Sequence, residues 1–379
     1  MTAAPDARRV IDCHVHALPG PAMHAFRASL SEGDLSEGPP RLWGSEAFAS
    51  PSLQVDALDR AGIETAVVTF SSNAPAALHA LARTTGRGAA ETVRAVNREL
   101  AGWAASSAGR LLPTAWVDPR LGDDALAQME RAVWEDGVVG LSTLCSFPPL
   151  GGSVPGAGEL QFLDSPRFAP ALELAASLGV PLFVHAGGKY RMAVGDPAPP
   201  PASLVFLTGS LSMPVEITLC VLRLLMAGTF ERLPGLRVVL GQLGGLFPFL
   251  LSRLELVSRL VAGPGASAIS PRMAEGALAH LPEQCGQISV DTHSMDGPAI
   301  LAALELLGDR NVVFGSDFPV TPQAAGREGP LEMLAELRLD PGGLERILAG
   351  NAEALLPASA RSPAVSPGVG PVGAGGGRR

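Results

Sequence analysis

Short apolar segments alternate with longer amphipathic segments along most of the chain. The longer segments carry apolar residues at helical spacing, and those before Gly62 and Gly179 end at a glycine, as helices often do. Alternation of short apolar strands with helices predicts a parallel sheet covered by helices. Eight apolar segments are predicted as strands: Val10–His16, Thr65–Phe70, Leu111–Val117, Val138–Ser142, Val180–His185, Arg237–Gly241, Ile288–Asp291 and Asn311–Gly315.

Eight such units fit a closed barrel better than an open sheet. An open doubly wound sheet is the alternative, but no G-x-G-x-x-G follows the first strand. We therefore predict the α/β class, a (β/α)8 TIM barrel over residues 1–356. A polar, Gly/Pro-rich segment at 19–51 is expected to be an insertion or flap near the active site. The Pro/Gly/Ala/Ser-rich tail, 357–379, is expected to be disordered.

Composition narrows the class of protein. The 379 residues are 47% apolar and 17% charged, which is typical of a globular protein with a large core. A net charge of −9 without a basic cluster argues against nucleic-acid binding. Glycines and a proline interrupt the most apolar region, and no signal core begins the chain, so we expect no membrane span and a cytoplasmic location. The expected partner is a small molecule, and a homodimer stays open.

The first predicted strand ends in Asp12-Cys13-His14-Val15-His16. Side chains two apart in a strand share a face, so His14 and His16 project together. Neutral imidazole nitrogens suit zinc and similar divalent ions. A short H-x-H arises by chance as well, so this motif needs support from elsewhere in the chain.

That support comes from the ends of the fifth and eighth strands. His185 closes the fifth strand and Asp317 directly follows the eighth. Active sites of TIM barrels lie at the C-terminal ends of the strands, so these residues would meet His14 and His16. Alone, His185 could be a core histidine and Asp317 a turn residue. Together they predict one divalent ion, with a position left for water or substrate.

Four motifs together resemble the amidohydrolase superfamily: D-x-H-x-H at 12–16, P-x-x-x-H at 181–185, G-G-x-x-P at 244–248 and G-S-D-x-P at 315–319. The more similar branch is that of amino-carboxymuconate-semialdehyde decarboxylase and the aromatic-acid decarboxylases, and the resemblance extends over 10–356. It implies a single ion, mostly zinc and sometimes manganese, held by His14, His16, His185 and Asp317. It also implies decarboxylation or hydrolysis of small, often aromatic, carboxylates. The absence of a lysine on the fourth strand agrees with one ion rather than two.

One position departs from that branch. The family has a histidine two residues before the Gly-Gly of strand six, where this chain has Gln242. An amide hydrogen-bonds but does not titrate, so Gln242 can orient a substrate without taking a proton from water. His293, two residues after Asp291 at the end of strand seven, could supply the missing acid or base, or could face solvent.

Four further residues are candidates for substrate binding. Lys189 and Arg191 follow His185 and could bind a carboxylate, or lie on a solvated loop. Arg41 and Trp43 lie in the insertion and could cover an aromatic ring, although Trp43 could equally be packing.

These residues leave three reactions open. Decarboxylation is favoured, with Asp317 delivering the proton to carbon, because that proton need not pass through Gln242. Hydrolysis of an amide or ester would need Asp317 or His293 as its base. Cyclisation of an aryl ester or amide with loss of water would use a nucleophile of the substrate itself. A relative that only binds a ligand is the remaining interpretation.

Overall fold

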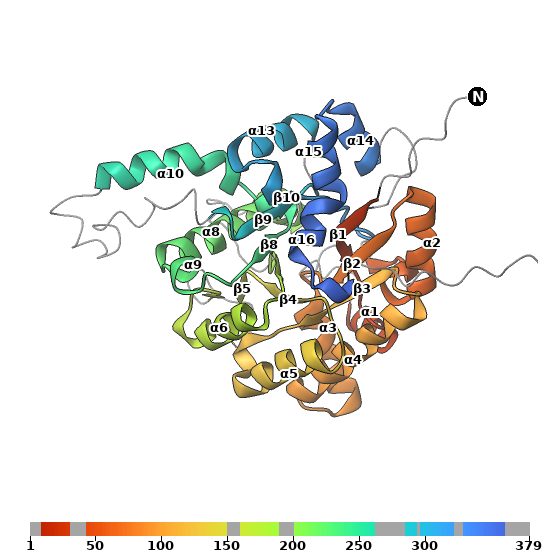
Figure 1. Ribbon diagram of the computed structural model, residues 1–379. Helices are drawn as coiled ribbons and strands as arrows, with labels where there is room; N and C mark the ends of the chain where they lie inside the picture. Colours follow the sequence, from red (N-terminus) through yellow and green to blue (C-terminus); the bar gives the residue numbers. More distant parts are fainter. Residues whose placement is uncertain are drawn as a thin grey trace, which may run out of the picture.

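Eight parallel strands form the centre of the computed structural model, which describes residues 9–30, 43–149, 160–188, 201–261, 285–293, 296–321 and 329–360. They run in the order β1-β2-β3-β4-β7-β8-β9-β10 (Figure 1). The backbone around Val15 joins Phe318, beyond β10, in a parallel bridge that brings the sheet's two edges together. The (β/α)8 barrel is therefore confirmed. Its strands are Ile11–His16, Thr65–Thr69, Leu111–Trp116, Gly140–Leu144, Leu182–His185, Val238–Leu240, Ile288–Asp291 and Val312–Val313.

Helices cover the outside of these strands in the predicted alternation (Figure 1). At least one helix connects each barrel strand to the next, and further helices follow β10. Several begin with proline at the first or second position, where its missing N–H costs nothing. Their bounds are α2 Pro51–Ala61, α4 Ala89–Ser106, α5 Asp123–Trp134, α6 Ala169–Leu178, α8 Met213–Met226, α10 Phe247–Val261, α13 Gly297–Leu307, α14 Pro330–Glu336 and α15 Pro341–Glu345.

Several elements were not predicted. The segment expected to be a polar flap contains α1 (Gly20–Ser29), which packs against the equally unpredicted α3 (Ala74–Thr85). The segment before α8 is helical too, as α7 (Pro201–Leu207) and a π-helical turn. A short α16 (Asn351–Leu355) and a 3-10 turn at Ala358–Ala360 end the described chain, so order extends past the expected boundary of the tail; 361–379 lie outside the described residues.

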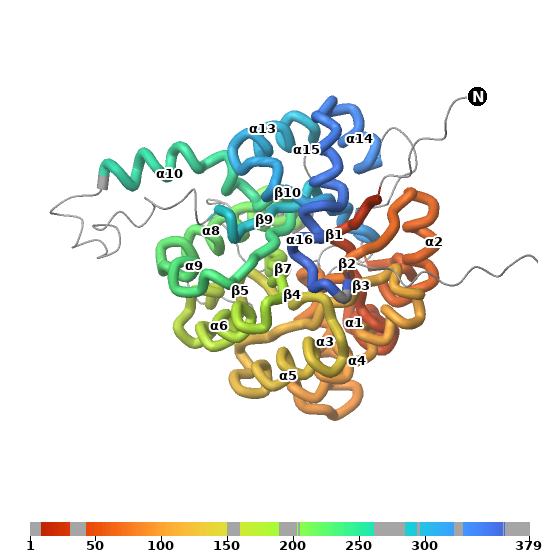
Figure 2. The backbone as a smooth tube through the Cα atoms, in the orientation of Figure 1, coloured from red at the N-terminus to blue at the C-terminus, as the bar shows by residue number. Residues whose placement is uncertain are grey.

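Two apolar clusters lie on opposite sides of the sheet. The larger one fills the space between strands and helices. The smaller one fills the inside of the barrel and is closed at one end by α16, which lies beside β1 in Figure 2. Its strand residues are Ile11, Cys13, Val67, Leu112, Val139, Phe183, Val239 and Val313. The opposite end of the barrel is thereby left for polar side chains.

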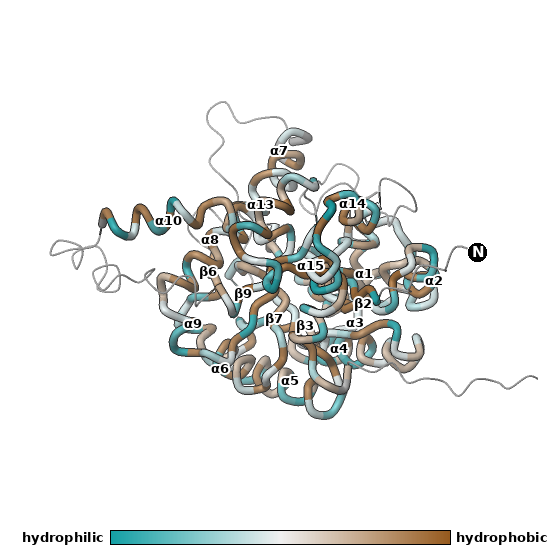
Figure 3. The backbone as a smooth tube through the Cα atoms, turned by 45° about the horizontal axis from the view of Figure 1, so that its top comes forward, coloured by the Kyte–Doolittle hydropathy of each residue, from teal (hydrophilic) through white to brown (hydrophobic). Residues whose placement is uncertain are grey.

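One helix of the described chain, Val205–Met226, is long and apolar enough to cross a bilayer by length and composition. Ile217, Cys220, Val221 and Leu224 are buried within the protein's own core. A helix packed on a barrel core passes the same test. In Figure 3, α10 instead alternates between apolar and polar residues along its length, as an amphipathic surface helix does.

Candidate metal centre

The end of β1 contains a bulge that turns two histidines toward the barrel mouth. Ile11 and Cys13 belong to the inner cluster, whereas Val15 belongs to the outer one. The side-chain alternation therefore reverses between Cys13 and Val15, where the register with β2 shifts. Bulges at barrel rims commonly re-aim side chains in this way. His14 and His16 then lie on one face, as the spacing of two predicts.

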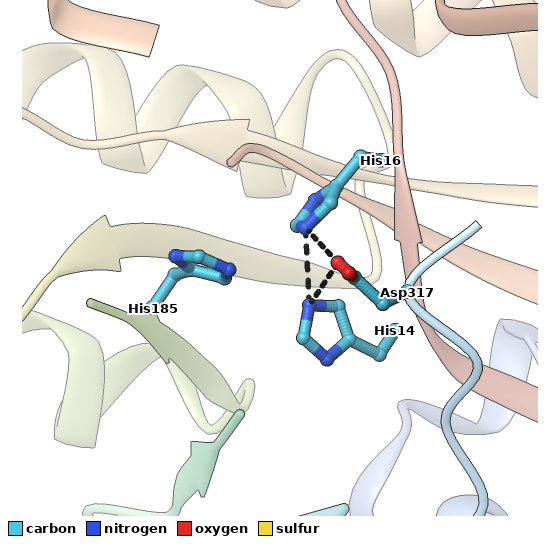
Figure 4. Close-up of side chains that lie close together, drawn as sticks. All are labelled: His14, His16, His185 and Asp317. Atoms are coloured by element: carbon cyan, nitrogen blue, oxygen red, sulfur yellow. Dashed lines mark hydrogen bonds and ion pairs between the residues drawn. The ribbon is translucent and has the colours of Figure 1, made fainter. Parts of the chain in front are cut away.

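Three imidazoles and one carboxylate meet at this mouth (Figure 4). His14 Nε2 lies 3.1 Å from His16 Nε2, and His16 Nε2 lies 2.8 Å from Asp317 Oδ1. One ligand-type atom from each of His14, His16, His185 and Asp317 lies within 4.8 Å of the others. All four residues are buried. The structure therefore brings together the four predicted ligands.

The environment favours the metal-binding forms of three of these groups, His16, His185 and Asp317. Burial, together with His16 and His14, lowers the pKa of His185 to about 3. Burial also lowers the pKa of His16. Burial alone would raise the pKa of Asp317, but His293 and His16 hold it well below its usual value. Neutral imidazoles beside an ionised carboxylate are the species that bind a divalent cation.

The donor set passes a simple test of fit to such a cation. Two imidazole nitrogens that face one another at 3.1 Å must share a proton or a cation, because two lone pairs repel. The other ring nitrogen of His14 is bound to Asp291, and that of His185 lies 2.9 Å from the carbonyl oxygen of Ala186. These contacts leave Nε2 of both rings to face the cluster, which is the usual arrangement around a metal.

Asp291, at the end of β9, positions His14. One of its oxygens contacts His14 Nδ1, and the other accepts backbone N–H groups from Leu243 at 3.0 Å and His293 at 3.1 Å. Burial alone would lower the pKa of His14, but the Asp291 carboxylate raises it to about 9. A carboxylate on Nδ1 keeps the proton there and leaves Nε2 as the metal-binding atom.

Asp12 supports the same region through the backbone. Its carboxylate accepts the N–H groups of His14 at 3.0 Å and Ser316 at 3.1 Å, and the Ser316 hydroxyl at 2.5 Å. Gly315 must be glycine, because a Cβ there would lie 2.8 Å from the Cβ of His14 and 2.9 Å from that of Asp291. Strands at the two edges of the sheet are thus held together at the metal ligands.

The two candidates for acid–base and substrate roles lie near the cluster. His293 Nε2 is 3.1 Å from Asp317 Oδ2, so its ring points into the site rather than into solvent. Gln242 follows Gly241, where an added Cβ would lie 3.1 Å from the His14 ring. The buried Oε1 of Gln242 has no hydrogen-bond partner among the described residues, and Gln242 is not among the residues that line the cavity beside the cluster. Gln242 and Leu243 both have φ of 53°, a costly conformation for residues other than glycine.

Of the other four substrate-binding candidates, the structure places only Trp43. Lys189, Arg191 and Arg41 lie outside the described residues. Trp43 is buried against Phe26 and Phe48, with ring centroids 5.8 Å away from each, and does not line the cavity at the cluster. That cavity is lined by Cys13, His14, Thr69, Phe70, Ser142, Phe183, Val184, His185, Val239, Gly241 and Asp291.

Sequence reasoning missed Glu216, which anchors the loop after His185. This fully buried carboxylate on α8 accepts N–H groups from Gly187 and Gly188, both at 3.0 Å, and the Ser146 hydroxyl at 2.6 Å. A Cβ on Gly187 would lie 2.8 Å from that carboxylate, so glycine is required there. An isolated acid in the apolar helix Met213–Met226 was the available signal.

A TIM barrel with a His3Asp cluster at its mouth defines a class of metal-dependent barrel enzymes. A family model described as amidohydrolase matches residues 11–358. The chain belongs to this amidohydrolase family.

Two relatives show which members of this family the chain resembles. A 2-amino-3-carboxymuconate-6-semialdehyde decarboxylase of Dictyostelium discoideum is 28% identical over 235 residues, covering 61% of this chain and 56% of that protein. A gamma-resorcylate decarboxylase of Rhodococcus jostii is 26% identical over 272 residues, covering 70% of this chain and 76% of the relative. The match to the first of these thus spans little more than half of that relative's length.

Solved structures share the fold. A 5-carboxyvanillate decarboxylase from Novosphingobium aromaticivorans, with bound manganese and a nitrobenzoic acid, superimposes with a TM-score of 0.70 at 18% identity, covering 93% of this chain and 98% of that one. A dihydroxybenzoic acid decarboxylase from Polaromonas, with manganese and 2-nitroresorcinol, gives 0.65 at 19% identity, covering 92% and 96%.

The cluster predicts one tightly bound divalent ion per chain. Metal analysis of protein purified without added metal should show close to one equivalent. His185→Ala should lose most of it, because an imidazole ligand is removed, while His79→Ala, an exposed histidine on α3, should keep it. A stoichiometry near two, or full retention in His185→Ala, would contradict the single site.

The contact between Asp291 and His14 predicts a second effect on metal affinity. Asp291→Asn puts an amide N–H₂ against a ring nitrogen or backbone N–H groups, so His14 loses its fixed tautomer. Affinity should fall about 10–100-fold, as for other partners of metal-bound histidines. Asp12→Asn is the matched control, because Asp12 contacts the backbone of His14 and not its ring. Equal affinities of the two variants, measured by chelator competition, would refute the positioning role of Asp291.

Proposed function

We propose that this enzyme is a metal-dependent carboxy-lyase that removes CO2 from a small aromatic or unsaturated carboxylic acid. The observation that carries the proposal is the cluster of His14, His16, His185 and Asp317 at the mouth of an amidohydrolase barrel. Two curated relatives, from different organisms, are decarboxylases of small carboxylic acids. The neighbours with bound manganese are decarboxylases as well.

The four clustered residues would hold one divalent ion. Three nitrogens and one oxygen suit zinc, which we propose as the resident metal, while manganese is the ion in two structural neighbours. Such an ion supplies a fixed positive charge that binds an oxygen of the substrate and stabilises negative charge developing on it.

Replacing CO2 by hydrogen requires one proton at the carbon that loses the carboxylate. Asp317 and His293 are placed to provide it, since His293 Nε2 lies 3.1 Å from Asp317 Oδ2. In this proposal His293 passes the proton that it holds to Asp317 Oδ2 as Asp317 delivers a proton to the substrate carbon, so Asp317 is ionised before and after the step and His293 is left neutral. The C–CO2 bond breaks, its electron pair stays on the substrate, and the new C–H bond uses that pair. No water is consumed.

Gln242 would bind the substrate without exchanging protons. Its amide oxygen is buried without a donor among the described residues, so an O–H or N–H of the substrate would satisfy it. The left-handed backbone at Gln242 and Leu243 is held in place by the bond from the Leu243 N–H to Asp291. Backbone strain that is held in place by a hydrogen bond, as at this turn, is typical of functional sites.

We also propose a cytoplasmic location. The four cysteines are free thiols, all buried, which suits a reducing compartment.

Product analysis tests the reaction directly. The metal-loaded enzyme, incubated with a panel of hydroxybenzoates and muconate-type acids, should release CO2 and give a product lighter by that mass. The metal-depleted enzyme should release none. A gain of one water would show hydrolysis and a loss of one water cyclisation, and either result in place of CO2 release would overturn the carboxy-lyase proposal.

Substitutions at the mouth separate the two side-chain roles. Gln242→Ala should lower kcat/KM by about two- to tenfold, the worth of one neutral hydrogen bond at about 0.5–1.5 kcal/mol. His293→Ala should lower kcat more, because the proton route is lost. Metal content should stay unchanged in Gln242→Ala.

Gln242→His serves as the reverse test, since a base at this position should raise hydrolysis rather than decarboxylation. A faster native reaction in Gln242→His, or an unchanged rate in Gln242→Ala, would contradict the substrate-positioning role.

A further inference from the structure

A histidine that binds a metal ion usually has a hydrogen-bond partner on its other ring nitrogen. That partner keeps the proton of the neutral ring on its own side and leaves the opposite nitrogen free to bind the cation. Asp291 contacts Nδ1 of His14, and the carbonyl oxygen of Ala186 lies 2.9 Å from Nδ1 of His185. The remaining imidazole is that of His16. Its Nε2 lies 2.8 Å from Asp317 Oδ1, so its Nδ1 is the nitrogen that needs a partner.

Thr69, the last residue of β2, lies beside His16. The two residues pair in register between β1 and β2. Asp12 pairs with Ala66 before the bulge, so an unshifted register would set Val15 opposite Thr69. The bulge adds one residue to β1 and puts His16 there instead.

The side chain of Thr69 lies on the inner face of the barrel. Val67 belongs to the inner apolar cluster and Val68 to the outer one, so alternation along β2 turns Thr69 inward. Thr69 is buried, and it lines the cavity together with His14 and His185. Its side chain therefore lies on the same side of the sheet as the metal cluster.

Two contacts of the Thr69 hydroxyl decide which way its hydrogen points. Oγ1 lies 3.2 Å from the carbonyl oxygen of Val15 and 3.3 Å from Nδ1 of His16. A carbonyl oxygen can only accept, so the hydroxyl donates its single hydrogen to Val15. A lone pair of Oγ1 is left for the ring, and the Nδ1–H of His16 donates to it. Nε2 of His16 then presents its lone pair to the cluster.

The position of the Thr69 hydroxyl is fixed by the backbone and by the side chain itself. The N–H of Ala17 donates to the Thr69 carbonyl at 3.1 Å, and branching at Cβ restricts the χ1 angle of a threonine in a strand. An acceptor that is already in place loses little entropy when the ring is held for metal binding. Because a hydroxyl is neutral, it is a weaker partner for His16 than the Asp291 carboxylate is for His14.

We propose that Thr69 is a positioning residue of the metal centre and acts through His16. Its hydroxyl oxygen accepts the Nδ1–H of the ring, which fixes the tautomer and orients Nε2 toward the other ligands. The inference rests on the proposed function only in requiring a bound ion, and not on the reaction that follows.

Zinc affinity, measured by chelator competition, tests this role with a set of threonine variants. Thr69→Val has a similar shape but no hydroxyl, so affinity should fall about tenfold, the lower end of the range for partners of metal-bound histidines. Thr69→Ser keeps the hydroxyl and should restore most of the affinity. Thr143→Val is the matched control and should bind zinc as the wild type does. Thr143 is a buried threonine of β4 whose hydroxyl donates to the carbonyl oxygen of Val117 at 3.0 Å.

Nuclear magnetic resonance of the zinc-loaded wild type, with isotope-labelled histidine, gives a readout that does not depend on a variant folding. Contacts with the side chain of Thr69 identify the ring of His16, and couplings to the carbon-bound ring protons distinguish Nδ1 from Nε2. The proton of His16 should lie on Nδ1. Its signal should move upfield in Thr69→Val, because a hydrogen bond to oxygen is lost, and should return in Thr69→Ser.

Several results would overturn the inference. A His16 ring that carries its proton on Nε2 would do so, and so would an unchanged zinc affinity in Thr69→Val. Equal losses of affinity in Thr69→Val and Thr69→Ser would show that packing and not the hydroxyl matters. An equal loss in Thr143→Val would show a general effect of removing a buried hydroxyl.

The same measurements separate the inference from the proposed function. A wild-type enzyme that binds no divalent ion would refute both. One bound ion whose affinity does not depend on the Thr69 hydroxyl would refute the positioning role alone. A Thr69-dependent affinity without CO2 release from any acid would leave the inference standing and refute the carboxy-lyase proposal.

Discussion

The carboxylate of Asp291 is the contact on which the geometry of the site depends. It joins three separate segments of the chain, namely the ring of His14 from β1, the backbone of Leu243 after β8 and the backbone of His293 after β9. Without it the imidazole of His14 has no fixed tautomer, and the strained turn at Gln242 loses its anchor. The buried side chain of Asp291 therefore connects the metal ligand His14, the turn that carries Gln242 and the acid–base candidate His293.

Barrel closure supplies the second constraint. β1 and the segment after β10 are 304 residues apart where Ser316 donates to Asp12, yet both carry metal ligands. Closing the sheet brings them within hydrogen-bonding distance, and the bulge in β1 turns both histidines inward. The cluster is thus a product of topology and of one local irregularity, and it forms only in the folded chain.

The difference between local patterns and contacts between distant segments explains what could be predicted from sequence. Strand ends and the spacing of His14 and His16 are local, so the barrel and the clustered residues could be predicted. The bulge in β1 contains no glycine, so the sequence contains no local signal for it. α3, Ala74–Thr85, was missed although local signals for it were present, since it has a proline in its first turn and ends at Gly86 in the left-handed conformation. The role of Glu216 depends on segments distant in sequence that meet only in three dimensions, and no local pattern encodes such contacts.

The central claim is that the mouth of the barrel presents three imidazoles and one carboxylate to a single ion. X-ray absorption spectroscopy of the metal-loaded enzyme tests it most directly, because imidazole rings and sulfur ligands give distinct signatures. The account predicts scattering from three imidazoles, the remaining ligands being oxygen. Fewer than three imidazoles, or a sulfur ligand from the adjacent buried Cys13, would contradict it.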